Sequence, residues 1–464
     1  MPPAIELRGK RVLVVGLART GVSTAQFCAA RGARVTASDA RSAAQLGEIA
    51  GRLREAGCTL EMGGHTSPAF LAQDLIVPSP GVPATLPPLV AAREAGIPIW
   101  SEIELASRFL RGRLVAITGS NGKTTTTALI AHILAGAGMP VIVAGNIGTP
   151  LISKVQDSSD RSVTVAEVSS FQLEWIESFR PEVAVLLNLT PDHLDRHASF
   201  EEYCRAKVRI FKNQTERDFA VLNADDAVVA RQAPSGPRLC WFSRSRRVAA
   251  GASLRDGLIV FRDAGGETGL LDRGDIGLRG EHNVENVLAA SSAAWLSGAP
   301  AAAIAAGVRS FPGVEHRLEF VAEIGGVQFF NDSKATNVDA TLKALGAFSG
   351  GLLVILGGKD KGSGYAPLIE PLQQRAKLVL LIGAAAEKIE SEIGAAVSVV
   401  RAGTLVSALT LAWEAAQPGD TVLLAPACAS FDQFDNFEHR GRVFKQLVRA
   451  LDTAHASAGP ARKG

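Results

Sequence analysis

The sequence predicts an α/β protein made of three consecutive α/β domains. Short apolar runs alternate with stretches of helical spacing along all 464 residues, which is typical of parallel sheets covered by helices. Two of these runs end in glycine-containing turns that open helices, at residues 16–21 and 119–127. A chain of this length holds about three domains of ordinary size. We expect domains at residues 1–107, 108–312 and 313–464.

The composition is that of a globular protein. Hydrophobic residues make up 47% and charged residues 20% of the chain, and 48 Lys and Arg nearly balance 46 Asp and Glu. This balance excludes the broad basic surface of nucleic-acid-binding proteins. No apolar run approaches the roughly 18 residues of a membrane span. Five scattered cysteines favour a reducing compartment. We therefore expect a cytoplasmic protein without nucleic-acid or membrane partners.

The expected N-terminal domain begins with a strand, a glycine turn and a helix. Residues 11–16 are apolar and lead into Gly16-Leu-Ala-Arg-Thr-Gly21, and a second β-like run over 33–39 ends at Asp39. This order favours a nucleotide site, with the carboxylate placed to bind a ribose. However, Ala18 stands where close approach to a pyrophosphate usually requires glycine, so an ordinary turn fits equally well and a standard NAD site is disfavoured.

The strongest local signal is ITGSNGKTTTT, residues 117–127. A strand delivers the chain to a glycine turn whose N–H groups can face an anion, and the next helix adds its dipole. Lys123 supplies charge for the β- and γ-phosphates of a nucleotide, and the Thr124 hydroxyl can bind Mg²⁺. Because Ile117 replaces the first glycine of the general pattern, the loop is a shortened variant that begins at Gly119. These elements together favour phosphate binding over a flexible helix start.

Two segments that follow strands of the central domain carry candidate metal ligands. Glu167 ends one apolar run, and residues 192–197, with Asp192, His193 and Asp195, follow another. Oxygen and imidazole ligands beside a phosphate-binding loop suit Mg²⁺ or Mn²⁺, although each residue taken singly fits a helix cap or a satisfied polar group better. Lys207 lies on a basic amphipathic helix, where its spacing predicts a solvated side chain without a role.

The expected C-terminal domain has three polar loops that follow apolar runs, at residues 329–341, 356–362 and 426–441. Helix starts and lysines hold carboxylates well, so these loops predict a pocket for a small acidic substrate. Both Lys359 and Lys361 can meet its anionic group, and the spacing from the two preceding glycines favours Lys361.

Three expectations concern secondary structure alone. Residues 240–278 have the short alternating runs of an antiparallel excursion, and an alanine-rich helical stretch covers 283–310. Phe431, Phe434 and Phe437 have helical spacing, which predicts a core-facing helix rather than a site.

Eight motifs, spread in order over all three expected domains, resemble those of the Mur ligases. They are TGSNGKTT (118–125), AGNIGTPL (144–151), EVSSFQLE (167–174), DHLDRH (192–197), EHNVEN (281–286), EHR (315–317), NDSKATN (331–337) and PACASFDQF (426–434). No single motif is specific, but the set is. The resemblance implies a Rossmann-like N-terminal domain for a UDP moiety, a central ATPase domain with a phosphate-binding loop, and a Rossmann-like C-terminal domain for an amino acid.

The resemblance implies an ATP-dependent amide ligase of cytoplasmic peptidoglycan precursor synthesis, and hence of cell wall biogenesis, cell shape and division. Its substrates would be UDP-N-acetylmuramoyl-L-alanine and D-glutamate, joined through an acyl-phosphate intermediate with release of ADP and phosphate. ATP and Mg²⁺ are the expected cofactors, with Mn²⁺ as a substitute. The partners would be these small molecules only, and the protein would be a monomer.

The resemblance also assigns roles residue by residue. Catalytic roles fall to Lys123, His193 and Lys207. ATP would be bound by Gly119, Ser120, Asn121, Gly122, Lys123, Thr124, Thr125, Asn283, Asn286, Arg317, Asp332 and Lys334. The UDP-linked substrate would be bound by Arg19, Thr20, Asp39, Arg41, Ser79, Gly81, Asn146 and Ser169, and the amino acid by Thr336, Lys361, Ser430 and Phe437. Metal would be held by Thr124, Glu167, His193 and Lys207, the last as a carbamate, which reverses the expectation of a solvated lysine.

Three alternatives remain open at this point. A ligase of the folylpolyglutamate-synthase type, or another Mur-type ligase, would use a different acceptor. An NAD-dependent oxidoreductase would use the first glycine turn, although Ala18 and the phosphate-binding loop argue against it. A nucleotide-binding switch would hydrolyse ATP slowly, without stimulation by glutamate or a UDP-sugar.

Overall fold

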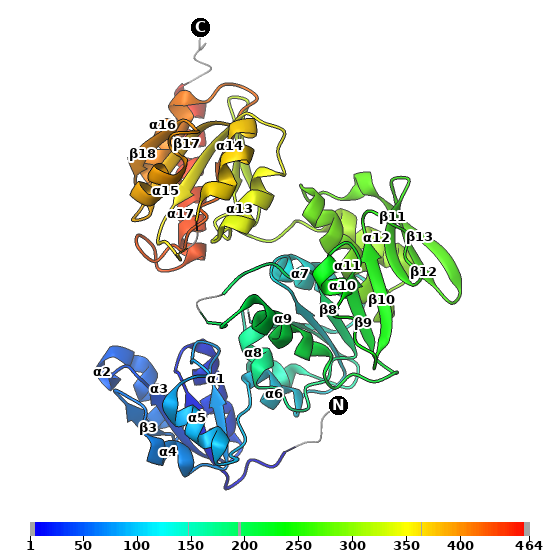
Figure 1. The fold of residues 1–464 in the computed structure, drawn as a ribbon, viewed down its shortest axis with the longest axis vertical. Helices are drawn as coiled ribbons and strands as arrows, with labels where there is room; N and C mark the ends of the chain where they lie inside the picture. The colour runs from blue at the N-terminus through cyan, green and yellow to red at the C-terminus, as the bar shows by residue number, and fades with distance from the viewer. Residues whose placement is uncertain (1–4, 147, 194–195, 363, 459–464) are drawn as a thin grey trace. The chain divides into compact units, whose positions relative to one another are not determined.

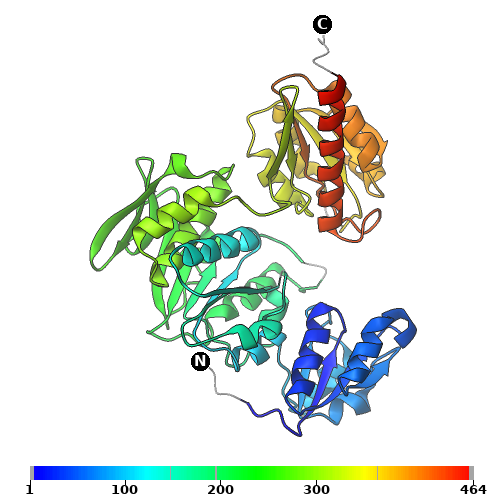
Figure 2. The same ribbon diagram turned by 180° about the vertical axis from the view of Figure 1, so that it is seen from behind.

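Two compact units make up the computed structural model. It describes residues 5–146, 148–193, 196–362 and 364–458. The first unit comprises Met1–Gly277 and Glu285–Phe311, and the second comprises Leu278–Val284 and Pro312–Gly464. Figures 1 and 2 show the chain from two opposite sides. In the described ranges the first unit holds two sheets and the second holds one.

A parallel sheet in the order β3-β2-β1-β4 opens the first unit. Its strands are β1 (Arg11–Val15), β2 (Arg34–Asp39), β3 (Thr59–Met62) and β4 (Leu75–Pro78), accompanied by helices α1 (Arg19–Ala30), α2 (Ala43–Leu46), α3 (Glu48–Glu55), α4 (Ser67–Leu71) and α5 (Pro87–Glu94). The expected strands at 11–16 and 33–39 are confirmed. A Cβ on Gly21 would lie 1.9 Å from the carbonyl oxygen of Gly16, so only glycine fits where β1 turns into α1.

The second sheet of this unit has nine strands in the order β13-β12-β11-β10-β9-β8-β5-β7-β6. They are β5 (Arg113–Thr118), β6 (Val141–Gly145), β7 (Val163–Glu167), β8 (Val183–Leu186), β9 (Phe219–Asn223), β10 (Arg238–Ser243), β11 (Gly251–Arg255), β12 (Leu258–Asp263) and β13 (Gly266–Asp272). The prediction of an antiparallel excursion is right for β11 to β13 and wrong for β10, which pairs in parallel with both neighbours. The chain crosses from β9 to β10 through a short helix and so re-enters the sheet in the same direction.

Helices and 3₁₀ turns complete this part of the unit. They are α6 (Glu102–Ser107), α7 (Lys123–Gly136), η1 (Leu151–Asp157), α8 (Ser170–Glu174), α9 (Phe200–Val208), η2 (Arg209–Phe211), α10 (Ala227–Ala230), η3 (Arg273–Asp275), α11 (Glu281–Leu296) and α12 (Ala301–Ser310). The helical stretch expected over 283–310 is therefore two helices. Gly298, with a φ of +94°, and Pro300, the N-cap of α12, interrupt it. None of the helices within the described ranges combines the length and apolar character needed to cross a bilayer.

The second unit contains a six-stranded sheet in the order β14-β15-β19-β16-β17-β18. Its strands are β14 (Glu319–Ile324), β15 (Val327–Asn331), β16 (Leu352–Gly357), β17 (Ala376–Ile382), β18 (Val399–Gly403) and β19 (Thr421–Leu424), with α13 (Val338–Leu345), η4 (Ala366–Leu368), α14 (Ile369–Arg375), α15 (Ala386–Ile393), α16 (Leu405–Ala415) and α17 (Phe437–Ala458). Among the described strands of this sheet, β14 alone runs antiparallel to its neighbour. The three sheets confirm the predicted α/β class.

Alternate residues of β16 pack into two different cores. Leu352, Val354 and Leu356 belong to one buried cluster, and Leu353 and Ile355 belong to the other. The sheet is thus covered on both faces, and Figure 2 shows the long helix α17 lying along one of them. This arrangement places the polar loops at the carboxyl ends of the parallel strands.

The aromatic helix face expected at residues 431–437 is wrong. Phe437 begins α17, while Phe431 and Phe434 lie in the preceding turn, and Phe431 is 67% exposed. The polar residues between the aromatic ones form the turn, so equal spacing in sequence does not place the rings on one face.

Two buried glutamates of α6 contact the central part of the first unit. Glu104 accepts hydrogen bonds from the N–H groups of residues 177–179 at 2.7–3.0 Å and from Arg108 Nε at 2.8 Å. Glu102 accepts one from Ile152 N–H at 2.6 Å, but its Oε2 is buried with no partner in the described part of the chain. Burial raises the pKa of Glu102 to about 7.

We expect Glu102→Gln to flatten the pH dependence of stability. Between the ordinary carboxyl value of 4.5 and about 7, the native state binds a proton that the unfolded state has lost, so the free energy of unfolding of the wild type falls as pH rises through this window. Above pH 7 the variant should be more stable, by up to about 3 kcal/mol. Urea unfolding at several pH values measures this, and the exposed Glu94→Gln is the control. Parallel curves for wild type and Glu102→Gln would contradict the prediction.

Candidate functional site

The expected phosphate-binding loop connects β5 to α7, and α7 begins at Lys123 directly after it. Gly122 caps the helix with a φ of +85°, and a Cβ there would lie 2.3 Å from Asn286 Oδ1. Glycine is therefore required at this position. The start of an α-helix carries N–H groups without partners inside the helix and the positive end of the helix dipole, and both favour the binding of an anion.

The Lys123 ammonium lies over the loop itself. Its Nζ donates hydrogen bonds to the carbonyl oxygens of Gly119 and Ser120, both at 2.8 Å. A cation is thus held beside the N–H groups of the loop, where it can meet a phosphate.

Thr124 and Glu167, which sequence analysis assigned to a metal, lie together beside this loop. Thr124 Oγ1 donates to Glu167 Oε2 at 2.7 Å, and Asn146 Nδ2 donates to the other carboxylate oxygen at 3.2 Å. Glu167 is buried at the end of β7. One carboxylate and one hydroxyl suit Mg²⁺, which commonly takes few protein ligands and completes its shell with phosphate oxygens and water.

His193 lies on the loop after β8. Its ring packs edge-on against Phe171, with 5.1 Å between ring centroids, and its Nε2 lies 3.7 Å from the Asp192 carboxylate. Asp195 falls outside the described residues. Within the described ranges, no group of three or more His, Cys, Asp and Glu side chains is close enough to hold a metal ion.

Lys207 corrects the prediction of a solvated side chain. It is 2% exposed on α9, and its Nζ donates to the carbonyl oxygen of Gly119 at 2.9 Å and lies 4.6 Å from the ring centroid of Tyr203. Burial, with a smaller contribution from the charge of Lys123, lowers the pKa of Lys207 well below its usual range. Periodicity missed this because Arg205, the other basic residue of α9, is exposed while Lys207 faces the phosphate-binding loop.

Several of the residues assigned to the UDP-linked substrate lie around the first glycine turn, residues 16–21. Asp39 ends β2, and its carboxylate accepts from the Arg41 guanidinium at 2.8 and 2.9 Å and from Leu17 N–H at 2.7 Å. The hydrogen bonds with Arg41 hold the pKa of Asp39 at about 2, so the carboxylate is ionised near neutral pH. Ser79 Oγ donates to the carbonyl oxygen of Gly16 at 2.6 Å. Thr20 lies in the first turn of α1.

Two arginines connect this region to the loops of the central sheet. Arg19 donates to the carbonyl oxygen of Gly148 at 2.6 Å, and Arg196 donates to that of Gly81 at 3.0 Å. Ser169 caps α8, where its hydroxyl accepts from Gln172 N–H. The arginine contacts therefore hold the loops that carry Gly81 and Asn146, and the helix cap holds Ser169.

In the second unit, Asp332 follows β15 and is 1% exposed. Its Oδ1 has no hydrogen-bond partner among the described residues, and burial raises its pKa to about 6 against the opposing charge of Arg317. An unsatisfied buried carboxylate is costly unless a ligand completes it. Lys334 lies nearby in sequence, with its Nζ 5.6 Å from the ring centroid of Phe437.

Of the residues assigned to the amino acid, Thr336, Lys361 and Ser430 lie on loops at the same sheet edge, and Phe437 begins α17. Lys361 Nζ donates to Thr336 Oγ1 at 3.3 Å, which brings these two together. Lys359 instead pairs through its backbone with Ala429, next to the buried Ser430. Asn283 belongs to the second unit and Asn286 to the first, where Asn286 Oδ1 accepts from Thr126 Oγ1 at 3.3 Å.

Sequence analysis missed Arg440 of α17, whose side chain is completely buried. It donates to the carbonyl oxygens of Ser333 at 2.9 Å and Cys428 at 3.2 Å, and so connects the loop after β15 to the loop after β19. An arginine on an amphipathic helix gives no sign of burial, because only the packing of α17 on the sheet creates it.

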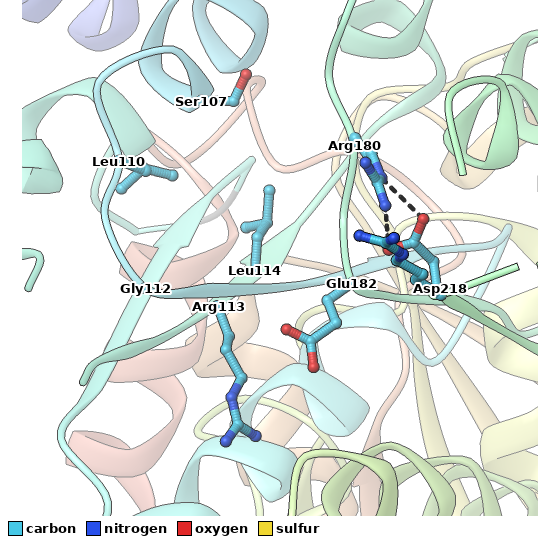
Figure 3. Close-up of a pocket in the computed structure, with 9 residues that line it drawn as sticks. Ser107, Leu110, Gly112, Arg113, Leu114, Arg180, Glu182 and Asp218 are labelled. Carbon is cyan, nitrogen blue, oxygen red and sulfur yellow. Dashed lines mark hydrogen bonds and ion pairs between the residues drawn. The ribbon is translucent and has the colours of Figure 1, made fainter. Parts of the chain in front are cut away.

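The cavity in Figure 3 lies at the other end of the central sheet. It measures about 350 Å³ and is lined by Ser107, Leu110, Gly112, Arg113, Leu114, Arg180, Glu182, Arg217 and Asp218. Arg180 is held in an ion pair with Asp218 at 2.8 Å. The lining residues precede or begin β5, β8 and β9, and ligands of parallel sheets bind at the opposite, carboxyl ends. We therefore place the candidate site at the loops after β5, β7 and β8.

Comparison with known proteins decides the family. The Mur ligase MurD-like N-terminal domain matches residues 10–101, the Mur ligase middle domain matches 117–294, and the Mur ligase glutamate ligase domain matches 316–428. The chain belongs to the Mur ligase family. Two relatives are named UDP-N-acetylmuramoylalanine–D-glutamate ligase. That of Acidobacterium capsulatum is 56% identical, over 96% of this chain and 97% of the relative, and that of Koribacter versatilis is 54% identical, over 96% and 99%.

Solved Mur ligases share the fold. The UDP-N-acetylmuramate-alanine ligase of Thermotoga maritima is 19% identical and has a TM-score of 0.59, over 95% of this chain and 99% of that chain. The membership of all three matched regions in one ligase family decides against an NAD-dependent oxidoreductase and against a non-catalytic switch. The recognised family is thus confirmed.

Proposed function

We propose that this Mur ligase joins D-glutamate to UDP-N-acetylmuramoyl-L-alanine with consumption of ATP, in peptidoglycan precursor synthesis. The observation that carries the proposal is the anion site of α7 with Lys123 above it and the Thr124–Glu167 pair beside it. The names of relatives at more than half identity supply the substrates. The folylpolyglutamate-synthase alternative has no comparable support.

In the first step, the substrate carboxylate attacks the γ-phosphorus of ATP and ADP leaves. The N–H groups from Gly122 to Thr125 would hold the phosphates, because those of Ser120 and Asn121 already donate to Asn188, and Lys123 would neutralise charge that builds on the phosphates. Mg²⁺, held by Thr124 and Glu167, would neutralise further charge on the phosphate oxygens. Asn146 and Ser169 would orient the muramoyl end, and we keep His193 as a proposed contact there or to metal.

In the second step, the glutamate amine attacks the acyl carbon, loses a proton, and phosphate leaves. Lys361 with Thr336, together with Ser430 and Phe437, would position the amino acid in the second unit. The hydrogen bond between the first two supports Lys361 rather than Lys359 as the carboxylate contact. Asp332 and Arg317 would contact the nucleotide, because Asp332 Oδ1, which has no hydrogen-bond partner among the described residues, can accept a hydroxyl donor.

We further propose that Lys207 carries a carbamate. A neutral amine is required to attack CO₂; the new N–C bond forms as the nitrogen loses a proton, and a cation becomes an anion. The burial that lowers the pKa of Lys207 supports this step because it favours the neutral amine. The resulting carboxylate-like group could then supply oxygen ligands.

Other features of the proposal follow from its substrates. ATP and UDP-linked sugars are made in the cytoplasm, so we propose that the reaction takes place there, in a monomer that acts on small molecules. We keep the division of the chain at residues 1–107, 108–312 and 313–464 for the UDP, ATP and amino-acid functions.

Phosphate release from the purified protein tests the proposed function. With ATP, Mg²⁺, UDP-N-acetylmuramoyl-L-alanine and D-glutamate all present, we expect sustained release, and omission of any one should abolish it. L-glutamate in place of D-glutamate should give little or none. Release that ignores both acceptor substrates would refute ligation, and release with folate in place of the UDP-sugar would favour the alternative acceptor.

A further inference from the structure

Asn188 lies two residues beyond β8, beside the phosphate-binding loop, and contacts two consecutive residues of it. Its side-chain Oδ1 accepts from Asn121 N–H at 2.8 Å, its Nδ2 donates to the Asn121 carbonyl oxygen at 3.1 Å, and its backbone oxygen accepts from Ser120 N–H at 3.0 Å. The primary amide therefore binds the backbone donor and acceptor of one residue at once, which fixes the peptide on both sides of Asn121.

Ser120 connects the same loop to the following segment. Its Oγ donates to the carbonyl oxygen of Thr190 at 2.9 Å and accepts from Thr190 N–H at 2.9 Å and from the Tyr203 hydroxyl at 3.0 Å. The loop is thus hydrogen-bonded to both Asn188 and Thr190, and this segment leads to Asp192 and His193.

We infer that Asn188 is a positioning residue that holds the phosphate-binding loop in its nucleotide-binding conformation. A glycine-containing loop loses conformational entropy when it closes on phosphates, and a scaffold that orders it beforehand lowers that cost. Lys123 contacts the loop carbonyls of Gly119 and Ser120, whereas Asn188 secures Asn121, the residue between them and Gly122. The two contacts are complementary, and only Lys123 is expected to touch the nucleotide.

This inference rests on the proposed function, since it concerns the ATP site. We expect Asn188→Ala to weaken the binding of a fluorescent ADP analogue by roughly ten-fold or more, because two hydrogen bonds that order the loop are lost. The KM for ATP should rise similarly while kcat at saturating ATP changes little, and the affinity for the UDP-linked substrate should stay the same.

Asn213→Ala is the matched control. Its amide also donates to backbone carbonyls, those of Glu177 and Phe179 at 2.9 and 3.1 Å, but at the far end of the sheet. It should lose similar stability without losing nucleotide affinity. If Asn188→Ala fails to fold, Asn188→Asp replaces it, since Asp keeps the size and the acceptor but loses the donor, and nucleotide affinity should again fall.

Nucleotide affinity equal to wild type in a folded Asn188 variant would overturn the inference. Equal losses of affinity for the ADP analogue and the UDP-linked substrate would also overturn it, because they would indicate general damage. The wild type separates this result from failure of the proposed function: if the unaltered protein binds no ADP analogue, the proposed function itself fails.

Discussion

Lys123→Ala should lose ligase activity by about 10³-fold, the magnitude expected when a positioned charge is removed from a phosphoryl-transfer site. The folded protein should persist, because Lys123 is half-buried and its Nζ donates to the carbonyl oxygens of Gly119 and Ser120, which belong to a loop and not to the sheet or its helices. We expect the free energy of unfolding to change by less than about 1 kcal/mol. Steady-state phosphate release and urea unfolding measure the two effects on the same preparation.

Lys154→Ala controls for the loss of any lysine. Lys154 lies in η1, is paired with Asp157 at 2.8 Å, and has 38% of its side chain exposed. Its replacement should leave both activity and stability near wild type. Activity near wild type in Lys123→Ala would contradict the role of Lys123 in phosphate binding. An unfolded variant would show instead that the lysine is structural.

Lys207→Met should reduce activity by roughly 10²- to 10³-fold without reducing stability. Methionine fills a similar volume but lacks the amine, so both the proposed carbamate and the cost of burying a charge disappear. The free energy of unfolding should stay the same or rise. Activity assays with denaturant unfolding separate this result from a lysine that only packs, whose loss would leave activity near wild type.

A carbon dioxide test addresses the carbamate directly. Wild-type activity should fall in CO₂-depleted buffer and return with bicarbonate, and ¹³C-bicarbonate should give a carbamate signal by NMR that Lys207→Met lacks. Lys212→Met, on an exposed lysine that follows η2, should retain the signal. Activity indifferent to CO₂, with no such signal, would contradict the carbamate.

Local sequence predicted the features that depend on neighbouring residues. Lys123 and Thr124 follow a strand and open a helix within a few residues. A short stretch of sequence therefore indicates both the chemistry of these residues and their place at the start of the helix. The same holds for Asp39 at the end of β2. These positions follow from backbone geometry that a short segment determines by itself.

Features that depend on packing could not be predicted in this way. Lys207 and Arg440 lie on amphipathic helices whose sequence does not show which face meets the protein, and both are buried. Asn188 has no motif of its own, since its role exists only because β8 lies beside β5. The hairpin of β14 and β15 was missed because β14 is a half-exposed edge strand with mixed side chains.

The central claim is amide ligation through an acyl phosphate, and the fate of the substrate carboxylate oxygens tests it most directly. UDP-N-acetylmuramoyl-L-alanine labelled with ¹⁸O in both carboxylate positions should be converted with ATP and D-glutamate to an extended amide. One labelled oxygen should appear in the released phosphate and the other should remain in the new amide carbonyl. Amide formation with unlabelled phosphate would contradict the acyl phosphate, and labelled substrate recovered unchanged while ATP is hydrolysed would contradict ligation.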